Sequence, residues 1–290
     1  MNTKRMTAAG LILFLCGTAA AALFGPDRNE KESVGKFDIA MQCWTFRKFT
    51  FFEAVERTAA LGIRYLEAYP GQALSPEAKN VRFDHELPDA WIQRIKDKLN
   101  EHDVRLVAYG VVDFENNREA MTKIFDFARQ MGIGTIVTEP PWEDFSLLNE
   151  FAVQYGIKVA IHNHPSPTQY ARPETVLRHV KGQSLLIGAC GDTGHWMRTG
   201  VDPVKALKML EGRVLHLHLK DLDRFGVKEA LDVPFGSGEA GMPEILTELT
   251  RQNYQGYLSI EHENPHEVMN PEPAIRKGLE YIRCATGNRD

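Results

Sequence analysis

From residue 37 onward, the chain alternates between short apolar runs typical of buried strands and longer amphipathic stretches typical of helices. The predicted strands are residues 37–44, 63–69, 104–112, 134–140, 158–165, 185–192, 213–221 and 256–263. Strict alternation of strand and helix requires parallel strands joined by helical crossovers. Eight such units in roughly 255 residues is the size at which a parallel sheet closes on itself. The pattern therefore favours a closed barrel.

The alternative to a closed barrel is a doubly wound open sheet. Such a sheet is expected to carry a glycine-rich phosphate turn after its first strand. The chain instead has Trp44-Thr45-Phe46-Arg47 at that position, and no linker or shift in composition divides it after residue 36. We therefore predict an α/β fold, a single-domain (β/α)8 barrel of the TIM type, over residues 37–290.

The N-terminal segment differs from the rest of the chain. Lys4 and Arg5 precede an apolar, alanine-rich run that ends near small residues at positions 20–22. This order is typical of a secretory signal peptide, which we assign to residues 1–24. The alternative interpretation of this run is an amphipathic first helix. It is disfavoured because the run carries no charges and so has no polar face. Residues 25–36 are predicted to be a polar linker, and the mature protein to be exported to the periplasm or the extracellular space.

Lipid anchoring and a membrane span are both disfavoured by the sequence. Cys16 could accept a lipid, but Leu15 stands before it where lipoproteins usually have a small residue. No later segment reaches the apolar length that spans a bilayer. Cys43, Cys190 and Cys284 form no Cys-x-x-Cys pair, so buried thiols are expected rather than a disulfide framework.

The charge of the chain bears on its partners. The formal net charge is −5, and no dense block of lysine and arginine follows the first few residues. The chain therefore lacks the wide basic surface typical of nucleic-acid binding. We expect a small-molecule substrate, with no nucleic acid and no membrane as partner. Assembly into a homo-oligomer is left open by the sequence.

Acidic and histidine side chains gather at the carboxyl ends of the predicted strands. In a closed parallel barrel these ends face one mouth, so residues far apart in sequence converge there. The residues at these ends are Glu67, Glu139, His162, Asn163, His164, Asp192, His195, His216, His218, Lys220, Asp221, Glu261, His262 and Glu263. This mouth is the predicted site.

Several carboxylates in one mouth indicate a bound cation. Like charges in a low-dielectric environment repel each other and drive protonation unless a cation compensates them. A ligand set from the fourth, sixth, seventh and eighth strands would comprise Glu139, Asp192, His218 and Glu261. Three carboxylates and one imidazole favour Mn²⁺ or Mg²⁺, with Co²⁺ or Zn²⁺ also open.

The remaining polar strand-end residues have simpler interpretations. We expect Glu67 and Glu263 to form salt bridges with neighbouring loops, and His216 to be a buried supporting histidine. Lys220 either pairs with Asp221 or binds substrate.

Three tryptophans are predicted near the mouth. Trp44, Trp142 and Trp196 are each expected to pack individually, but together they could form an apolar wall against a sugar face.

These motifs, taken in order, carry a family resemblance. Glu139 after the fourth strand, GDTGH with Asp192 and His195, HLKD at 218–221 and GYLSIEHE with Glu261 together resemble the xylose-isomerase-like barrel superfamily of sugar isomerases and epimerases. The resemblance covers nearly all of residues 37–282. After the seventh strand, HLKD and the loop FGSGEAG stand where the epimerases usually have an arginine-bearing segment.

The resemblance implies roles for these residues. It assigns the metal to Glu139, Asp192, His218 and Glu261, and it makes the two glutamates the catalytic acid/base pair. It also implies that His195 binds a substrate oxygen. We further expect His164, Lys220 and Trp44 to contact the substrate.

The predicted activity is a metal-dependent isomerisation or epimerisation of a keto- or aldo-sugar, with proton transfer through an enediolate. If the carbon next to the carbanion bears a leaving group, the same first step gives β-elimination, so a lyase acting on 3-keto-glycosides is the alternative. Two other classes stay open: an endonuclease IV-like enzyme with three zinc ions, and a non-catalytic sugar-binding barrel.

Overall fold

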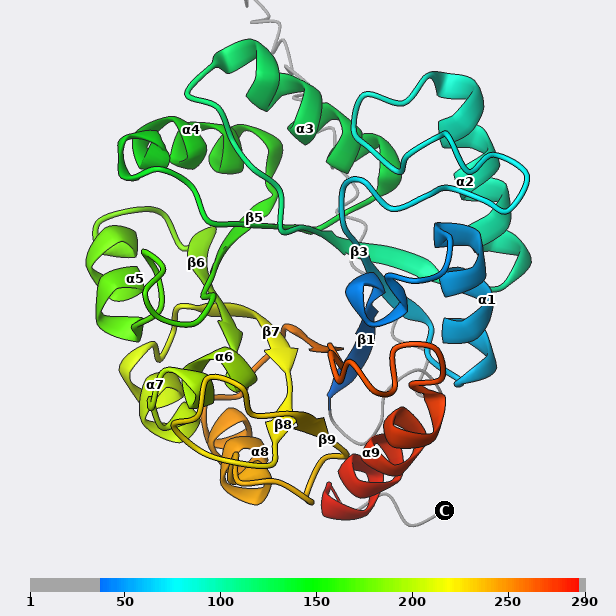
Figure 1. Cartoon of the computed structure of the whole chain (residues 1–290). Coiled ribbons are helices and arrows are strands. Elements are labelled where there is room, and N and C mark those ends of the chain that lie inside the picture. Colours follow the sequence, from blue (N-terminus) through cyan, green and yellow to red (C-terminus); the bar gives the residue numbers. More distant parts are fainter. Residues whose placement is uncertain (1–36, 287–290) are drawn as a thin grey trace, which may run out of the picture. The chain divides into compact units, whose positions relative to one another are not determined.

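The computed structural model describes residues 37–286, which form a closed barrel of eight parallel strands (Figure 1). The barrel strands are β1 (Asp38–Gln42), β2 (Tyr65–Ala68), β3 (Arg105–Tyr109), β4 (Thr135–Thr138), β5 (Lys158–His162), β6 (Ile187–Asp192), β7 (Val214–Leu219) and β10 (Tyr257–Ile260). Their order around the ring is β1-β10-β7-β6-β5-β4-β3-β2. The first and last strands close the ring, with Met41 beside Ile260. The predicted barrel is confirmed, whereas the predicted signal peptide (1–24) and linker (25–36) lie outside the described residues.

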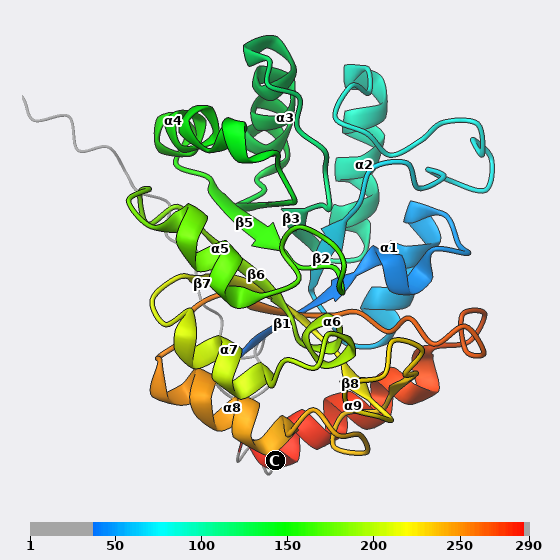
Figure 2. The same cartoon turned by 60° about the vertical axis from the view of Figure 1, so that its left-hand side comes forward.

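Helices surround the barrel and connect its successive strands (Figures 1 and 2). They are α1 (Phe51–Ala60), α2 (Asp89–Glu101), α3 (Arg118–Met131), α4 (Phe145–Tyr155), α5 (Pro173–Val180), α6 (Thr193–Arg198), α7 (Pro203–Met209), α8 (Met242–Arg251) and α9 (Glu272–Ala285), with the short 3-10 helices η1 (Cys43–Phe46) and η2 (Trp142–Asp144). Within residues 37–286, no helix combines the length and apolar character that crossing a bilayer requires.

Side-chain caps fix the starts of several helices. Asp202 accepts hydrogen bonds from the backbone N–H groups of Val204 and Lys205, and Pro203 follows it in the first turn of α7. Asp192 caps α6 in the same way, because its Oδ1 accepts the N–H of His195 at 2.7 Å. The other oxygen of Asp192, Oδ2, takes no part in the cap and faces the barrel mouth.

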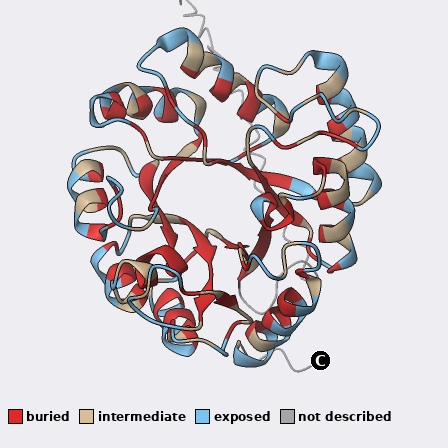
Figure 3. Cartoon of the chain, viewed as in Figure 1, coloured by how far each residue is buried: buried red, intermediate tan, exposed pale blue. Residues whose placement is uncertain are grey.

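The apolar core lies mainly between the strands and the inner faces of the helices (Figure 3). The barrel interior near the mouth is polar instead: Glu67, His216, His218 and Lys220 are all buried there. Buried charges of this kind require partners or a ligand. Their concentration inside the barrel therefore marks the site.

The segment after β7 contains structure that the sequence did not predict. The expected long glycine-rich loop includes a two-stranded antiparallel sheet of β8 (Asp221–Leu222) and β9 (Asp232–Val233). The Asp221 carboxylate accepts backbone N–H groups of Gly236, Gly238 and Ala240 at 2.8–3.0 Å. Asp221 thus holds this loop together. The alternative in which Lys220 pairs with it is wrong.

One glycine of β6 offers a test of the barrel packing. A Cβ added to Gly188 would lie 2.2 Å from the backbone carbonyl oxygen of Arg213, the residue just before the neighbouring strand β7, and this backbone atom cannot rotate away. We expect Gly188→Ala to lower the free energy of unfolding by about 2–3 kcal/mol, measured by urea denaturation. Gly134→Ala is the matched control, because a Cβ there meets nothing within 4 Å. Equal stability of the two variants would contradict this packing.

Candidate active site

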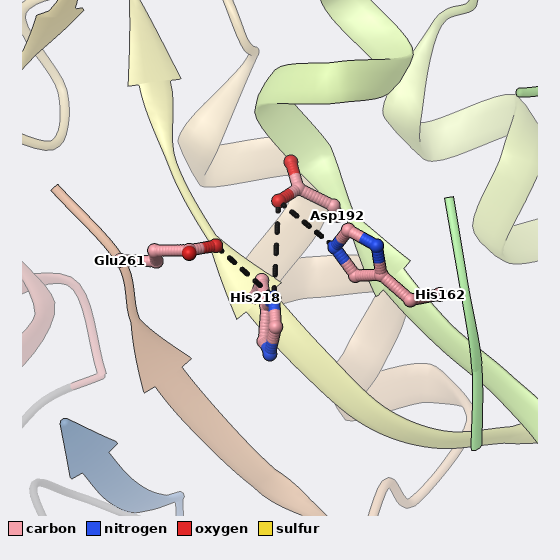
Figure 4. A group of neighbouring side chains, drawn as sticks. All are labelled: His162, Asp192, His218 and Glu261. Carbon is pink, nitrogen blue, oxygen red and sulfur yellow. Dashed lines mark ion pairs between the residues drawn. The ribbon is translucent and has the colours of Figure 1, made fainter. Parts of the chain in front are cut away.

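Four side chains from separate strands converge at the mouth of the barrel (Figure 4). His162 ends β5, Asp192 ends β6, His218 lies on β7, and Glu261 directly follows β10. All four are buried. Asp192 Oδ2 lies 3.6 Å from His162 Nε2 and 3.9 Å from His218 Nδ1, and the latter atom is 3.1 Å from Glu261 Oε2.

The facing atoms of this cluster are suited to a metal ion. His162 Nε2, Asp192 Oδ2, His218 Nδ1 and Glu261 Oε2 are all buried and make no regular hydrogen bond, although the Lys220 ammonium group forms ion pairs with the Asp192 and Glu261 oxygens at 2.9 Å. Polar atoms that are buried without hydrogen bonds are costly, and a shared divalent cation would coordinate all four at once. Two imidazoles and two carboxylates are suited to Mn²⁺, Co²⁺ or Zn²⁺, and less to Mg²⁺, which prefers oxygen ligands.

Glu139, which the sequence placed among the metal ligands, lies behind this cluster. Its Oε1 accepts hydrogen bonds from His162 Nδ1 at 2.8 Å, His164 Nδ1 at 2.6 Å and the His164 backbone N–H at 2.9 Å. Burial alone would raise the pKa of Glu139, but the bonds from the two histidines lower it to about 2. The geometry puts His162 in the position expected for Glu139, whose role as a ligand stays a prediction.

Glu139 also sets which nitrogen of each histidine carries a proton. An ionised carboxylate only accepts, so both Nδ1 atoms must donate. In the neutral rings, Nε2 of His162 then has a free lone pair facing Asp192, and Nε2 of His164 is free to accept a proton. The sequence contained His162 as one of several polar residues after the fifth strand, but nothing in it singled this residue out as a ligand.

Lys220 is the cation of the site. Its Nζ lies 2.9 Å from both Asp192 Oδ2 and Glu261 Oε2, and 2.6 Å from Glu263 Oε2. Burial alone would lower the pKa of Lys220, but the carboxylates, Asp192 first, raise it well above its ordinary value. Lys220 therefore stays an ammonium ion. It compensates part of the negative charge of the carboxylates, for which the sequence predicted a metal ion as the sole compensating cation.

His195 stands beside this cation at the start of α6. Its Nε2 lies 3.7 Å from Asp192 Oδ2 and 3.5 Å from Lys220 Nζ, and its Nδ1 is 3.1 Å from Arg198 Nη1. Arginine can only donate, so Nδ1 accepts, while Nε2 faces both the acceptor Asp192 Oδ2 and the donor Lys220 Nζ. Burial, followed by the charge of Lys220, holds the pKa of His195 well below its ordinary value, although Asp192 opposes the shift. The imidazole of His195 is thus held in its neutral form.

A cavity of about 300 Å³ opens onto this cluster. Its lining includes Gln42, Trp44, Tyr69, Pro70, Gly110, Val111, His162, His164, His195, His218, Glu261 and Glu263. The predicted substrate contacts of Trp44, His164 and His195 therefore lie on its wall. Lys220 lies behind the wall, in contact with Glu261 and Glu263.

The predicted wall of three tryptophans is wrong. Trp44 lines the cavity, and its Nε1–H donates to Glu263 Oε1 at 3.0 Å. Trp196 is fully buried and packs beneath β6 against Gly191, so it supports the strand. Trp142 is half exposed and stacks on His179, away from the cavity lining.

A second polar network lies deeper in the barrel. Glu67 Oε2 is 2.8 Å from His216 Nε2 and 2.6 Å from Ser259 Oγ, while its Oε1 is 2.9 Å from His218 Nε2. The expected salt bridge between Glu67 and a loop is wrong, because the side chain points inward from β2. His216 is a buried supporting residue, as predicted. Glu263 is ion-paired, as predicted, with Lys220 and Arg198.

Comparison with known proteins identifies the family of this barrel. Residues 55–284 match the model of the family described as "Xylose isomerase-like TIM barrel". The inosose dehydratase of Mesomycoplasma hyopneumoniae strain 7448 is 26% identical over 280 residues, covering 81% of this chain and 88% of that protein. The inosose dehydratase of Clostridium perfringens strain 13 is 24% identical over 297 residues, covering 87% and 97%.

Solved structures agree with this relationship. An uncharacterised protein of Parabacteroides distasonis superposes with a TM-score of 0.69 at 32% identity, covering 85% of this chain and 98% of that one. Dehydratases are lyases, so the named relatives support the elimination alternative better than the isomerase expectation. The chain is therefore an enzyme of the xylose isomerase-like TIM barrel family.

Proposed function

We propose that this enzyme is a metal-dependent carbon–oxygen lyase acting on a keto-sugar or a related cyclic polyol ketone, with 3-keto-glycosides as the preferred substrate class. The observation that carries the proposal is the cluster of four buried, converging ligand atoms of His162, Asp192, His218 and Glu261 beside a cavity of about 300 Å³. A cavity of this size fits a small ligand. The inosose dehydratases among the relatives support elimination as the reaction class.

The reaction is a β-elimination. A base removes the proton next to the ketone, and the electron pair of that C–H bond forms the new carbon–carbon double bond through an enolate. The C–O bond at the next carbon breaks, and its electron pair leaves with the oxygen, which takes up a proton. A bound divalent ion would supply Lewis-acid stabilisation of the charge that develops on the ketone oxygen.

The residues of the cavity supply the other functions. His164 lies on the wall with its Nδ1 held by Glu139, which leaves Nε2 to accept the proton, as in other histidine–carboxylate pairs. His195 lies on the same wall, where its ring would hydrogen-bond a substrate oxygen. Trp44 and Tyr69 offer apolar surfaces to a sugar ring. In this assignment Glu139 acts through His164, rather than as the base itself.

The test is incubation of the Mn²⁺-loaded enzyme with a panel of 3-keto-glycosides and keto-cyclitols, followed by mass spectrometry. Elimination releases an aglycone, or one water from a cyclitol, whereas isomerisation and epimerisation conserve substrate mass. Glu139→Gln and His164→Gln are expected to lose turnover. A product of the same mass as the substrate would contradict the lyase activity and favour an isomerase or epimerase instead.

We also propose that the enzyme acts outside the cytoplasm. The order of charged, apolar and small residues in the first 24 positions supports this. Intact-mass measurement of protein recovered from expressing cells would show whether this segment is removed. Recovery of a chain that still carries residues 1–24 would contradict export.

A further inference from the structure

Glu67 lies beneath the metal-binding cluster and contacts the far side of one of its ligands. It is buried within the barrel, where it shares its carboxylate between His216, His218 and Ser259. The two ring nitrogens of His218 face different neighbours. Nε2 lies 2.9 Å from Glu67 Oε1, whereas Nδ1 is 3.1 Å from Glu261 Oε2 and has no hydrogen-bond partner.

We propose that Glu67 is a positioning residue that keeps the proton of His218 on Nε2, so that the Nδ1 lone pair is available to the metal. This inference rests on the metal site proposed above. The carboxylate of Glu67 can accept hydrogen bonds but cannot donate them while it is ionised. Its two oxygens face the His218 Nε2, His216 Nε2 and Ser259 Oγ atoms at 2.6–2.9 Å, an arrangement suited to an accepting carboxylate. Nε2 of His218 must therefore donate.

The arrangement gives both histidines of the cluster a carboxylate on the side away from the metal. Glu139 holds Nδ1 of His162, and Glu67 holds Nε2 of His218. Each carboxylate fixes the orientation and protonation of its ring and raises the basicity of the ligating nitrogen. Glu67 does not line the cavity, and within the cluster it hydrogen-bonds to His218. Any effect of Glu67 on the metal therefore passes through the ring of His218.

Replacing Glu67 by glutamine inverts this arrangement. Two donors, His216 Nε2 and Ser259 Oγ, face the Oε2 position, while only His218 faces Oε1. The amide carbonyl is therefore expected at the Oε2 position and the NH₂ group opposite His218. Nε2 of His218 would then have to accept, and the proton of the neutral ring would move to Nδ1, where it blocks the metal.

The experiment measures Zn²⁺ affinity and proton position in the full-length protein. Competition with a chromophoric chelator should show about 10–100-fold weaker Zn²⁺ binding in Glu67→Gln. Ser259→Ala is the matched control, because it removes a hydrogen bond to Glu67 but leaves the contact with His218, and it should bind Zn²⁺ nearly as the wild type does.

Long-range ¹H–¹⁵N spectra of the histidine rings give a readout that needs no variant and no turnover. In the wild type, Nε2 of His218 should carry a proton both without and with Zn²⁺, and Nδ1 should shift on Zn²⁺ addition. An unprotonated Nε2, or unchanged Zn²⁺ affinity in Glu67→Gln, would overturn the proposal. A wild type that takes up no Zn²⁺ would instead overturn the metal-dependent function, and the proton position would still test Glu67 by itself.

Discussion

Lys220→Met is expected to destabilise the metal-free protein by about 3–5 kcal/mol, because breaking a buried ion pair leaves uncompensated charge. Methionine matches the length and volume of the lysine stem but carries no charge. Without the ammonium ion, the carboxylates of Asp192, Glu261 and Glu263 face each other in a buried environment. Urea denaturation of chelator-treated protein measures the loss.

Added metal separates this electrostatic effect from a packing defect. A divalent ion that binds the folded state stabilises it by mass action, and in Lys220→Met it also relieves the repulsion between the carboxylates. Saturating Mn²⁺ should therefore stabilise the variant more than the wild type. Lys123→Met is the control, because Lys123 forms an exposed ion pair with Glu86 and its removal should leave stability essentially unchanged. A Lys220→Met protein as stable as this control would refute the assigned role.

Asp192→Asn is expected to abolish metal binding and to reduce turnover by about a thousandfold or more, which corresponds to several kcal/mol of lost charge stabilisation. The substitution is conservative for the fold, because the amide oxygen can still cap α6 through the N–H of His195. At the other position, however, an NH₂ group would face Lys220 Nζ and the two histidine ligands. Metal content by elemental analysis and turnover on the best substrate of the panel measure the effect.

Asp202→Asn provides the same chemical change at another helix start. Asp202 caps α7 just as Asp192 caps α6, but it contacts no residue of the site. Metal content and turnover of Asp202→Asn should match the wild type. If Asp192→Asn retained one metal ion per chain, His162, His218 and Glu261 would have to hold it without Asp192, and the four-residue cluster would be wrong.

The fold could be predicted from sequence because its signals are local. Apolar runs and amphipathic stretches each report on a few neighbouring residues, and strict alternation of strand and helix then allows few topologies. The sheet of β8 and β9 was missed because its strands are only two residues long and Asp221 holds the loop through backbone N–H groups. Neither feature leaves an apolar pattern.

The sequence predicted the location of the site well, but it predicted the contacts between its side chains less well. Convergence at the barrel mouth follows from topology, which is why Asp192, His218 and Glu261 could be grouped in advance. Which side chain faces the centre depends on how neighbours share hydrogen bonds. Two histidines hydrogen-bond the Glu139 carboxylate, and three carboxylates surround Lys220. Strand position alone carries no information about this competition.

The pairing of β1 with β10 has a consequence for how the chain can be synthesised. The two strands come from opposite ends of the described sequence, so until β10 has left the ribosome both β1 and β7 remain open sheet edges. Unpaired edges are templates for aggregation, and long-range closure of this kind is intrinsically slow. Glu261 directly follows β10, so the last ligand arrives with the strand that seals the barrel. Metal uptake by nascent chains would therefore report completion of folding rather than guide it.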